Sequence, residues 1–188
     1  MKVLLVQTSP NTDGLTGSMA LRAMEGTESQ GAQTELVHLC RLRIGACQAC
    51  DNGWGRCARE GLCSQEDAFQ GLRDRMHAAQ AFVLSTPVYF GEVSESAKSF
   101  LDRLRRCEWF IRDTSPLRRV PAVGIAAAGG SGGGTVSAMA DLERYFSHLH
   151  MPLFDLLPVT QRSREYQLQS AFAAGAALVA YARRQFGG

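Results

Sequence analysis

Short apolar runs alternate along the chain with stretches in which apolar residues recur every three or four positions. The first pattern is typical of buried strands and the second of amphipathic helices. Lys2–Gln7, for example, is a leucine- and valine-rich run, whereas Phe69, Leu72 and Met76 repeat with the period of a helix. The strand-like runs are 2–7, 35–39, 81–85, 120–128 and 153–159, and helices are expected at about 16–30, from 67, from 94, around 139–149 and at 168–185.

This alternation predicts an α/β fold in one domain that covers residues 1–188. Five strands, each followed by a helix, indicate a parallel, doubly wound sheet. Right-handed crossovers then place helices on both faces, which makes a three-layer sandwich. Residues 40–66 have no sustained period and hold five of the six cysteines. We expect this cysteine-rich insertion to be functional, because loops of that length are uncommon in compact domains.

Composition excludes several classes of protein. Of the 188 residues, 45% are hydrophobic, which argues against disorder. The chain has 20 basic and 18 acidic residues, and a net charge of +2 argues against nucleic acid or an anionic membrane as a partner. Neither a leader peptide nor a membrane span is expected, since the apolar start has only the length of a strand. A cytoplasmic location follows, with thiols or metal ligands in preference to disulfides.

A hydroxyl-rich turn follows the first strand and leads into a helix. Residues 8–16 read TSPNTDGLT and offer the hydroxyls of Thr8, Ser9, Thr12 and Thr16. Backbone N–H groups at a helix N-terminus, together with hydroxyl donors, can bind a phosphate. The turn has no Lys or Arg, and neither GxxxxGKS/T nor GxGxxG occurs there, so one phosphate monoester fits better than a triphosphate or a dinucleotide. A simple capped turn is the alternative.

Two further loops leave strand ends that belong to the same edge of the sheet. Residues 86–91 read TPVYFG, and the exit of a buried strand carries two aromatic residues, which are either core or a shelf for a flat ligand. Residues 129–134 contain five glycines, whose entropic cost is hard to explain unless a ligand or a chain passes against bare backbone. Ligands bind at this edge of open parallel sheets. The three loops together suit a planar ring with a single phosphate tail, such as flavin mononucleotide (FMN).

The chain resembles the NAD(P)H-dependent FMN reductases and related flavodoxin-like flavoproteins over nearly its full length. The stretch TPVYFGEVSESAKSFLDRL (residues 86–104) is similar to the family's Pro-Val-Tyr, aromatic and Gly, followed by a helix with Lys-x-Phe and Asp-Arg. The family's phosphate loop reads Gly-Ser-Pro-Arg, two variable residues, then Gly-Asn-Thr. Ser9, Pro10, Gly14 and Thr16 match this loop, and Thr8, Asn11 and Leu15 depart from it.

The resemblance implies a flavodoxin-like fold with strand order 2-1-3-4-5. It also implies an enzyme in which NAD(P)H reduces bound FMN, with electrons passed to flavin, quinone or another small acceptor. No catalytic side chain is expected, because the cofactor carries the difficult chemistry. Family members form homodimers or homotetramers, with the helix after Ser94 as a candidate contact. The implied FMN contacts are Ser9, Asn11, Gly14, Leu15 and Thr16 at the phosphate, and Pro87, Val88, Tyr89, Phe90, Gly129, Gly130 and Gly133 at the ring.

The insertion contains the pattern Cys47-x2-Cys50-x6-Cys57-x5-Cys63. Four thiols can ligate a [4Fe-4S] cluster or zinc, or can remain free in a loop that covers the flavin. Iron–sulfur flavoproteins, which are relatives of the family, carry a compact cysteine run here, typically with a second gap of two residues where this chain has six. The alternative function is therefore a non-enzymatic electron-transfer flavoprotein with such a cluster.

The remaining chemistry-bearing residues are expected to be structural. Cys40 and Cys107 fit no ligand spacing and are predicted to be small buried hydrophobic residues. Trp54, inside the insertion, either closes over the flavin or anchors the loop, and Trp109 is expected in the core or at an interface. The four histidines lie in strand or helix patterns without a nucleophile at a meaningful spacing.

Overall fold

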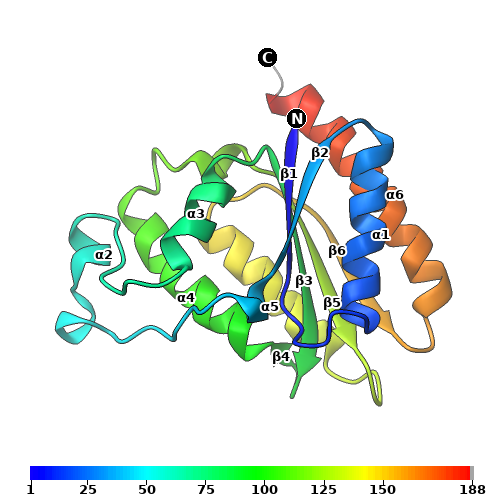
Figure 1. Cartoon of the computed structure of the whole chain (residues 1–188), viewed down its shortest axis with the longest axis horizontal. Helices are drawn as coiled ribbons and strands as arrows, with labels where there is room; N and C mark the ends of the chain where they lie inside the picture. The colour runs from blue at the N-terminus through cyan, green and yellow to red at the C-terminus, as the bar shows by residue number, and fades with distance from the viewer. Residues whose placement is uncertain (187–188) are drawn as a thin grey trace.

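The computed structural model describes residues 1–186 and has the predicted doubly wound α/β architecture (Figure 1). Within these residues, five parallel strands pair in the order β2-β1-β3-β5-β6, which is the predicted order 2-1-3-4-5. A sixth, two-residue strand, β4, pairs antiparallel with the end of β3; no pattern of two residues can predict it. The strands are β1 (Lys2–Gln7), β2 (Gln33–His38), β3 (Ala81–Tyr89), β4 (Glu92–Val93), β5 (Ala122–Ala128) and β6 (Leu153–Thr160).

The long helices cover both faces of the sheet, with α1 and α6 on one side and α3, α4 and α5 on the other (Figure 1). Alternation along β1 explains how one strand serves both layers. Val3 and Leu5 pack with α1 and α6, whereas Leu4 and Val6 face the opposite helices. The long helices are α1 (Leu15–Ser29), α3 (Phe69–His77), α4 (Glu95–Phe110), α5 (Thr135–His148) and α6 (Arg164–Phe186).

Two glycines allow α1 and α6 to pack backbone against backbone. A Cβ atom at Gly26 would lie 2.0 Å from the carbonyl oxygen of Phe172, and one at Gly175 would lie 2.1 Å from that of Ala23. Any larger side chain at either position would push the helices apart. The contact closes the layer that covers one face of the sheet.

The insertion after β2 extends away from the sheet along α4 (Figure 1). It contains short helical turns: η1 (Leu39–Arg41), η2 (Asp51–Gly53) and α2 (Arg56–Arg59). A further turn, η3 (Pro116–Arg119), follows α4. None of the helices within residues 1–186 combines the length and the apolar character that a membrane-spanning segment needs.

One prediction about a single residue is confirmed, one is wrong, and of the two places predicted for Trp109 the core is excluded. Cys107, on α4, is fully buried in the core, as expected. Cys40 is exposed, because it lies in η1 beyond the end of β2, where its thiol donates to the carbonyl of Ser9 (3.2 Å). Trp109 does not lie in the core; it is 53% exposed on the outer side of α4, since the apolar stripe of that helix passes through Leu104 and Cys107.

Candidate functional site

The β1–α1 loop is fixed to its neighbours through Thr8, at the carboxyl edge of the sheet. The Thr8 N–H donates to the carbonyl of Ser85 on β3 (3.0 Å), and the Ser94 hydroxyl donates to that of Thr8 (2.8 Å). Ser96 also donates to the Thr8 carbonyl (2.9 Å). Thr8 is fully buried, so its hydroxyl holds the start of α4 and does not face a ligand.

The predicted phosphate-binding residues surround the N-terminus of α1. The Ser9 hydroxyl accepts a hydrogen bond from the Asn11 N–H (3.1 Å), which shapes the turn. Gly14 precedes the helix and, in the described part of the chain, gives it no side-chain cap. Leu15 and Thr16 have buried side chains, so their backbone N–H groups are what this turn can offer to a ligand. An uncapped helix N-terminus without an acidic first turn favours an anion.

A glycine that sequence reasoning missed brings this turn close to the helix. A Cβ atom at Gly17 would lie 2.1 Å from the Thr12 carbonyl oxygen. The backbone of the turn therefore folds directly onto the first turn of α1. The signal in the sequence was a glycine at a helical position, which is unfavourable unless close packing requires it.

The end of β3 presents its two aromatic residues to the outside. Pro87 is buried and Val88 half-buried, whereas Tyr89 is 46% exposed and Phe90 is completely exposed. Phe90 has a φ of +51°, which is uncommon for a bulky residue. A strained, fully exposed aromatic residue is typical of a functional position. Of the two interpretations of these aromatic residues, the exposed shelf is therefore the one observed.

The glycine loop after β5 lies against the turn that follows Phe90. A Cβ atom at Gly134 would be 2.6 Å from the Cα atom of Gly91, and the Ser137 hydroxyl donates to the Gly91 carbonyl (2.7 Å). Among residues 1–186, no atom would contact a Cβ atom at Gly129 or Gly130. These loops enclose an open cavity of about 490 Å³ lined by Val88, Phe90, Gly91, Ala128 and residues 129–134.

The structure thus brings two of the three predicted loops into one cavity. Val88, Phe90 and the glycine loop share it, while Tyr89 is adjacent in sequence. The β1–α1 loop is not part of the lining, but it leaves the neighbouring strand at the same edge, since β3 lies between β1 and β5 (Figure 1). This cavity, with an uncapped helix N-terminus beside it, has the parts expected for a ring and its phosphate tail.

The four cysteines of the predicted ligand set come together in the insertion. Cys47, Cys50, Cys57 and Cys63 all line one small cavity, which Cys107 closes from α4. The six-residue gap folds back on itself: the Gly53 N–H donates to the Ala49 carbonyl (2.9 Å). Within residues 1–186, no group of three or more His, Cys, Asp or Glu side chains is arranged closely enough to hold a metal ion.

Three arginines hold the insertion by its backbone carbonyls. Arg103 donates to Gly45 (3.0 Å), Arg106 to Gly53 and Arg73 to Gly61 (2.6 Å). Arg103 is also paired with Asp67, with N–O distances of 2.6 and 2.9 Å. Fixed arginines thus attach the cysteine-rich segment to α3 and α4 at three points spread along its length.

Two of these arginines also supply hydrogen-bond donors to the cysteine cavity. Arg103 and Arg106 both line it, and in the described part of the chain the buried Nε of each has no partner. A hydrogen bond with Cys57 is the largest cause of the raised pKa of Arg106. Burial raises the pKa of Cys107 to about 12, so this thiol stays protonated. The donor set, four thiols in a cavity that Arg56 lines together with Arg103 and Arg106, fits the chemistry of an iron–sulfur cluster.

Comparison with known proteins identifies the family. The family model for NADPH-dependent FMN reductases matches residues 1–158. The chain belongs to this family. An iron–sulfur flavoprotein of Methanocaldococcus jannaschii is 27% identical over 146 residues, which are 78% of this chain and 72% of that protein.

Two further comparisons set the extent of the likeness. An iron–sulfur flavoprotein of Archaeoglobus fulgidus is 33% identical over 105 residues, or 56% of this chain, and this match spans about half (49%) of the relative's length. An NAD(P)H:quinone oxidoreductase from Methanothermobacter marburgensis has a similar fold, with a TM-score of 0.72 at 17% identity. That alignment covers 95% of this chain and 96% of the other. The resemblance to FMN reductases and the flavodoxin-like fold are both confirmed.

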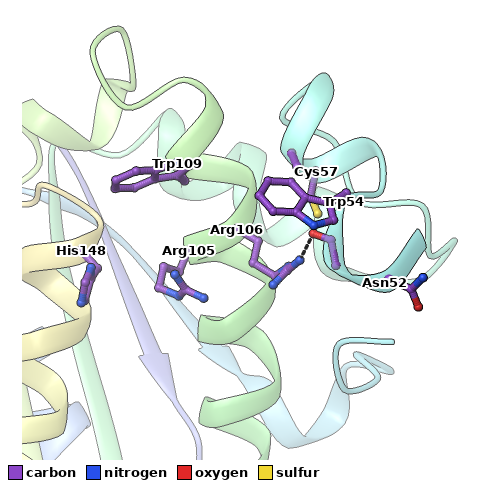
Figure 2. Close-up of a pocket in the computed structure, with 9 residues that line it drawn as sticks. Asn52, Trp54, Cys57, Arg105, Arg106, Trp109 and His148 are labelled. Atoms are coloured by element: carbon purple, nitrogen blue, oxygen red, sulfur yellow. Dashed lines mark hydrogen bonds between the residues drawn. The ribbon is translucent and has the colours of Figure 1, made fainter. Parts of the chain in front are cut away.

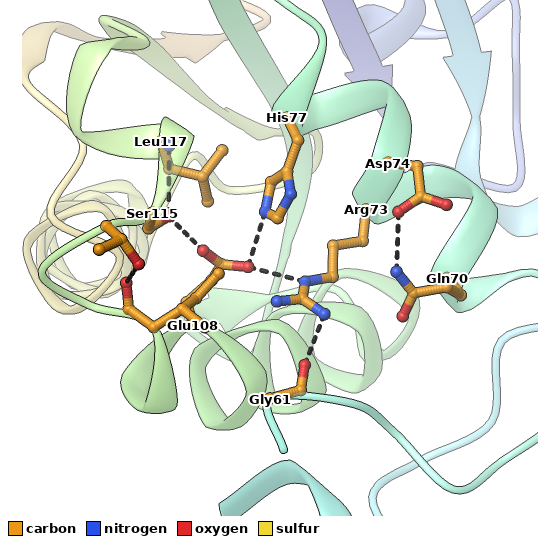
Figure 3. Close-up of polar contacts among 10 residues, drawn as sticks. Gly61, Gln70, Arg73, Asp74, His77, Glu108, Ser115 and Leu117 are labelled. Atoms are coloured by element: carbon orange, nitrogen blue, oxygen red, sulfur yellow. Dashed lines mark hydrogen bonds and ion pairs between the residues drawn. The ribbon is translucent and has the colours of Figure 1, made fainter.

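In this FMN reductase-family chain, a buried carboxylate on α4 connects that helix to α3 and to the residue before η3 (Figure 3). The Arg73 Nε donates to Glu108 (2.7 Å), and His77 Nε2 lies 2.8 Å from the same carboxylate oxygen. The Ser115 hydroxyl donates to the other oxygen. Burial raises the pKa of Glu108, but the bonds from His77, Ser115 and Arg73 outweigh it and hold the pKa below its ordinary value.

Sequence reasoning missed the arginines and Glu108, although the helix pattern contained a signal. Arg103 lies between Phe100 and Cys107 on the apolar stripe of α4, and Glu108 follows at its end. A charged residue at a core position must be paired, because an isolated buried charge is very costly. The sequence cannot say which partner it finds, since Asp67 and Arg73 come from another segment.

Proposed function

We propose that this chain is an FMN-dependent oxidoreductase that uses NAD(P)H and delivers electrons to a small acceptor such as flavin or quinone. The observation that carries the proposal is the cavity between the exposed Phe90 and the bare backbone of the glycine loop. Membership of the NADPH-dependent FMN reductase family supports the same function. The names of the relatives indicate a flavin, and the cavity offers a surface that suits one.

The residues present fit FMN at three points. Phe90 offers an aromatic side chain at the cavity rim, where it can pack on a flat ring. At Gly129 and Gly130 a ligand can approach the main chain directly, because no β-carbon stands in the way. At the first turn of α1, N–H groups and the partly exposed Thr12 hydroxyl can bind a phosphate.

The protein's part in the reaction is to bind, orient and shield. When bound, FMN supplies the redox chemistry, since its ring can accept a hydride from NAD(P)H and release electrons singly or in pairs. The Gly91–Gly134 contact fixes the distance between the two ring-facing loops. The Ser94 and Ser96 hydroxyls fix the β1–α1 turn relative to α4. These contacts make the site largely preformed, which reduces the entropic cost of binding.

The test is FMN binding followed by reduction. Flavin-free protein is titrated with FMN while the flavin fluorescence is recorded, and the loaded protein is then mixed with NADPH without oxygen. We expect saturable binding of one FMN per chain and rapid loss of the flavin absorbance. Phe90→Ala should weaken FMN binding by about tenfold, because it removes an aromatic contact. Phe110→Ala, which truncates an exposed aromatic residue on the outer end of α4, is the matched control and should bind FMN normally.

Two results would contradict the proposal in different ways. Absence of FMN binding refutes the site itself. Normal FMN binding without reduction by NADPH or NADH refutes the enzyme and favours an electron carrier. Assembly into homodimers or homotetramers stays a prediction, for which light scattering of the loaded protein is the measurement.

A second function is favoured by the cysteine cavity. We propose that Cys47, Cys50, Cys57 and Cys63 bind an iron–sulfur cluster and that the chain passes electrons between the cluster and the flavin. The four thiols share one cavity, and the unpartnered Arg103 and Arg106 Nε groups can donate to its sulfur atoms. The two curated relatives compared above are both named as iron–sulfur flavoproteins. Binding requires the thiols to approach one another more closely than they do in this structure.

Protein purified without oxygen distinguishes the possibilities. A cluster predicts iron and acid-labile sulfide in equal amounts, and Cys57→Ser should lose both. Cys40→Ser is the matched control, since Cys40 lies outside the cavity. Zinc without sulfide, or no metal at all, would contradict the cluster and leave the FMN proposal intact.

A further inference from the structure

The only two tryptophans in the sequence lie on the walls of a single open cavity (Figure 2). Trp54 comes from the insertion and Trp109 from α4, and they are 73% and 53% exposed. The cavity between them has a volume of about 520 Å³, which is within the range of small-molecule sites. It is a different cavity from the one beside Phe90 and the glycine loop.

Positive charge without a counter-ion lines the same cavity. Arg105 and Arg106 lie between the two indole rings, and His148 approaches from the end of α5 (Figure 2). Among the described lining residues there is no carboxylate, and neither arginine forms an ion pair within residues 1–186. The hydrogen bond that Arg106 donates to an oxygen atom goes to a neutral carbonyl, that of Gly53. A cavity with unpaired guanidinium groups attracts anions.

The two observations together specify a class of ligand. Indole rings bind flat aromatic molecules by stacking or edge contacts, and guanidinium groups bind sulfonates, carboxylates and phosphates. The Trp109 ring already has the Arg112 guanidinium 4.9 Å from its centre and remains half exposed. We propose that this cavity binds a planar aromatic anion, with the ring against Trp54 and Trp109 and the anionic group at Arg105 and Arg106.

This cavity lies directly beside the cysteine cavity of the insertion. Cys57 and Arg106 line both this cavity and the cysteine cavity, so a bound ring would lie beside one of the four thiols. Use of the bound molecule as an electron acceptor rests on the function proposed above, whereas binding itself does not. The FMN cavity lies at the carboxyl edge of the sheet and contains none of the residues that line this one.

Anthraquinone-2-sulfonate is a suitable probe, and FMN-loaded protein is the form to titrate. Both tryptophans face the cavity, so the intrinsic tryptophan emission reports on it directly. We expect saturable quenching with one probe per chain, a stoichiometry that calorimetry measures independently. Acridine orange, a planar cation of similar size, should bind at least tenfold more weakly because of the two arginines. Equal binding of the cation, or quenching that does not saturate, would overturn the proposal.

Variants locate the bound probe. Arg105→Gln should weaken binding at least fivefold by calorimetry, and Trp109→Ala at least tenfold. Arg119→Gln, which removes an exposed arginine on η3, is the matched control and should leave the affinity unchanged. The flavin absorbance of each variant reports the FMN site separately. If the unmodified protein binds the probe but no FMN, the proposed function alone is refuted. If it binds FMN but not the probe, this inference alone is refuted.

A second copy of the chain is the alternative occupant of this cavity. If a second copy of the chain covers the cavity, light scattering will show a dimer that Trp54→Ala dissociates, and the probe will not bind. That result would overturn the ligand site. An unchanged affinity in both Arg105→Gln and Trp109→Ala would overturn it as well, because the probe would then be bound elsewhere.

Discussion

Replacing Glu108 with Gln should destabilise the protein more than any exposed charge substitution. Glu108 is fully buried, and its partner Arg73 has a side chain that is 4% exposed. The glutamine keeps the size of the side chain but removes its charge. The Arg73 guanidinium is then left buried without a counter-ion, while its bond to the Gly61 carbonyl persists (Figure 3).

The expected loss follows from the cost of breaking a buried ion pair, about 3–5 kcal/mol. The surviving bond to Gly61 places the loss at the lower end, about 3 kcal/mol. For a chain of this length, the melting temperature falls by about 2–4 °C for each kcal/mol, so we expect a drop of about 6–12 °C. The pKa of Glu108 in the folded protein lies below its ordinary value. The difference in stability between the protein and Glu108→Gln is therefore fully present above the pKa that Glu108 has in the unfolded chain. It disappears as the pH falls through the folded pKa.

Thermal and urea denaturation of the two proteins at neutral pH provide the measurement. Glu60→Gln is the matched control, because Glu60 pairs with Arg56 at the surface, where both side chains are 48% exposed. That substitution should cost less than about 1 kcal/mol. Adding Arg73→Met to Glu108→Gln should recover part of the loss, since the unpaired charge is then removed.

A small effect would refute this reasoning. If Glu108→Gln costs no more than Glu60→Gln, the buried carboxylate contributes nothing beyond a surface pair. If Arg73→Met makes the Glu108→Gln protein less stable still, the unpaired guanidinium is not the cause of the loss.

Two further predictions concern stability. Gly175→Ala should lower the melting temperature by several degrees, because its Cβ atom would lie 2.1 Å from the Ala23 carbonyl oxygen; Gly71→Ala, with open space around it, should be neutral or stabilising. Burial raises the pKa of Asp67, but Arg103 and two backbone N–H groups outweigh it and bring the pKa to about 2. The contribution of Asp67, about 2–3 kcal/mol, should therefore be lost as the pH falls from about 4 to about 2. Urea denaturation of the protein and of Asp67→Asn at several pH values measures this loss, and a pH-independent difference would contradict it.

The layers and the ligand-facing edge could be predicted from the sequence because they depend on local patterns, whereas the strand order was implied by the resemblance to flavodoxin-like proteins. Alternation along Lys2–Gln7 and the period of Phe69, Leu72 and Met76 define a strand and a helix without reference to the rest of the chain. The chirality of crossover connections then restricts the topology. The predicted end of β3 was short by four residues, since Pro87 interrupts the apolar run but still aligns with Ala127 of β5.

The grouping of the three candidate loops at one edge was predictable from the sequence, with one limit. Loops at the carboxyl ends of parallel strands meet at one edge, so the order of the strands is enough to group residues 8–16, 86–91 and 129–134. Exposure could not be predicted, because an aromatic residue at a strand end packs inward or outward according to its neighbours. The exposed Phe90 and its φ of +51° appear only in the folded chain.

By itself, the sequence determined the α/β class, the layer order and the edge at which a flavin is expected, because each of these follows from short-range periodicity and the handedness of the chain. The tertiary structure alone decided which side chains meet across distant segments. It brought Cys63 beside Arg103, Arg73 to Glu108 and Trp54 to the cavity of Trp109. Such pairings depend on the path of an insertion without periodicity. They depend on which ion-pair and hydrogen-bond partners lie next to the buried charged side chains and the backbone carbonyls when the whole chain folds.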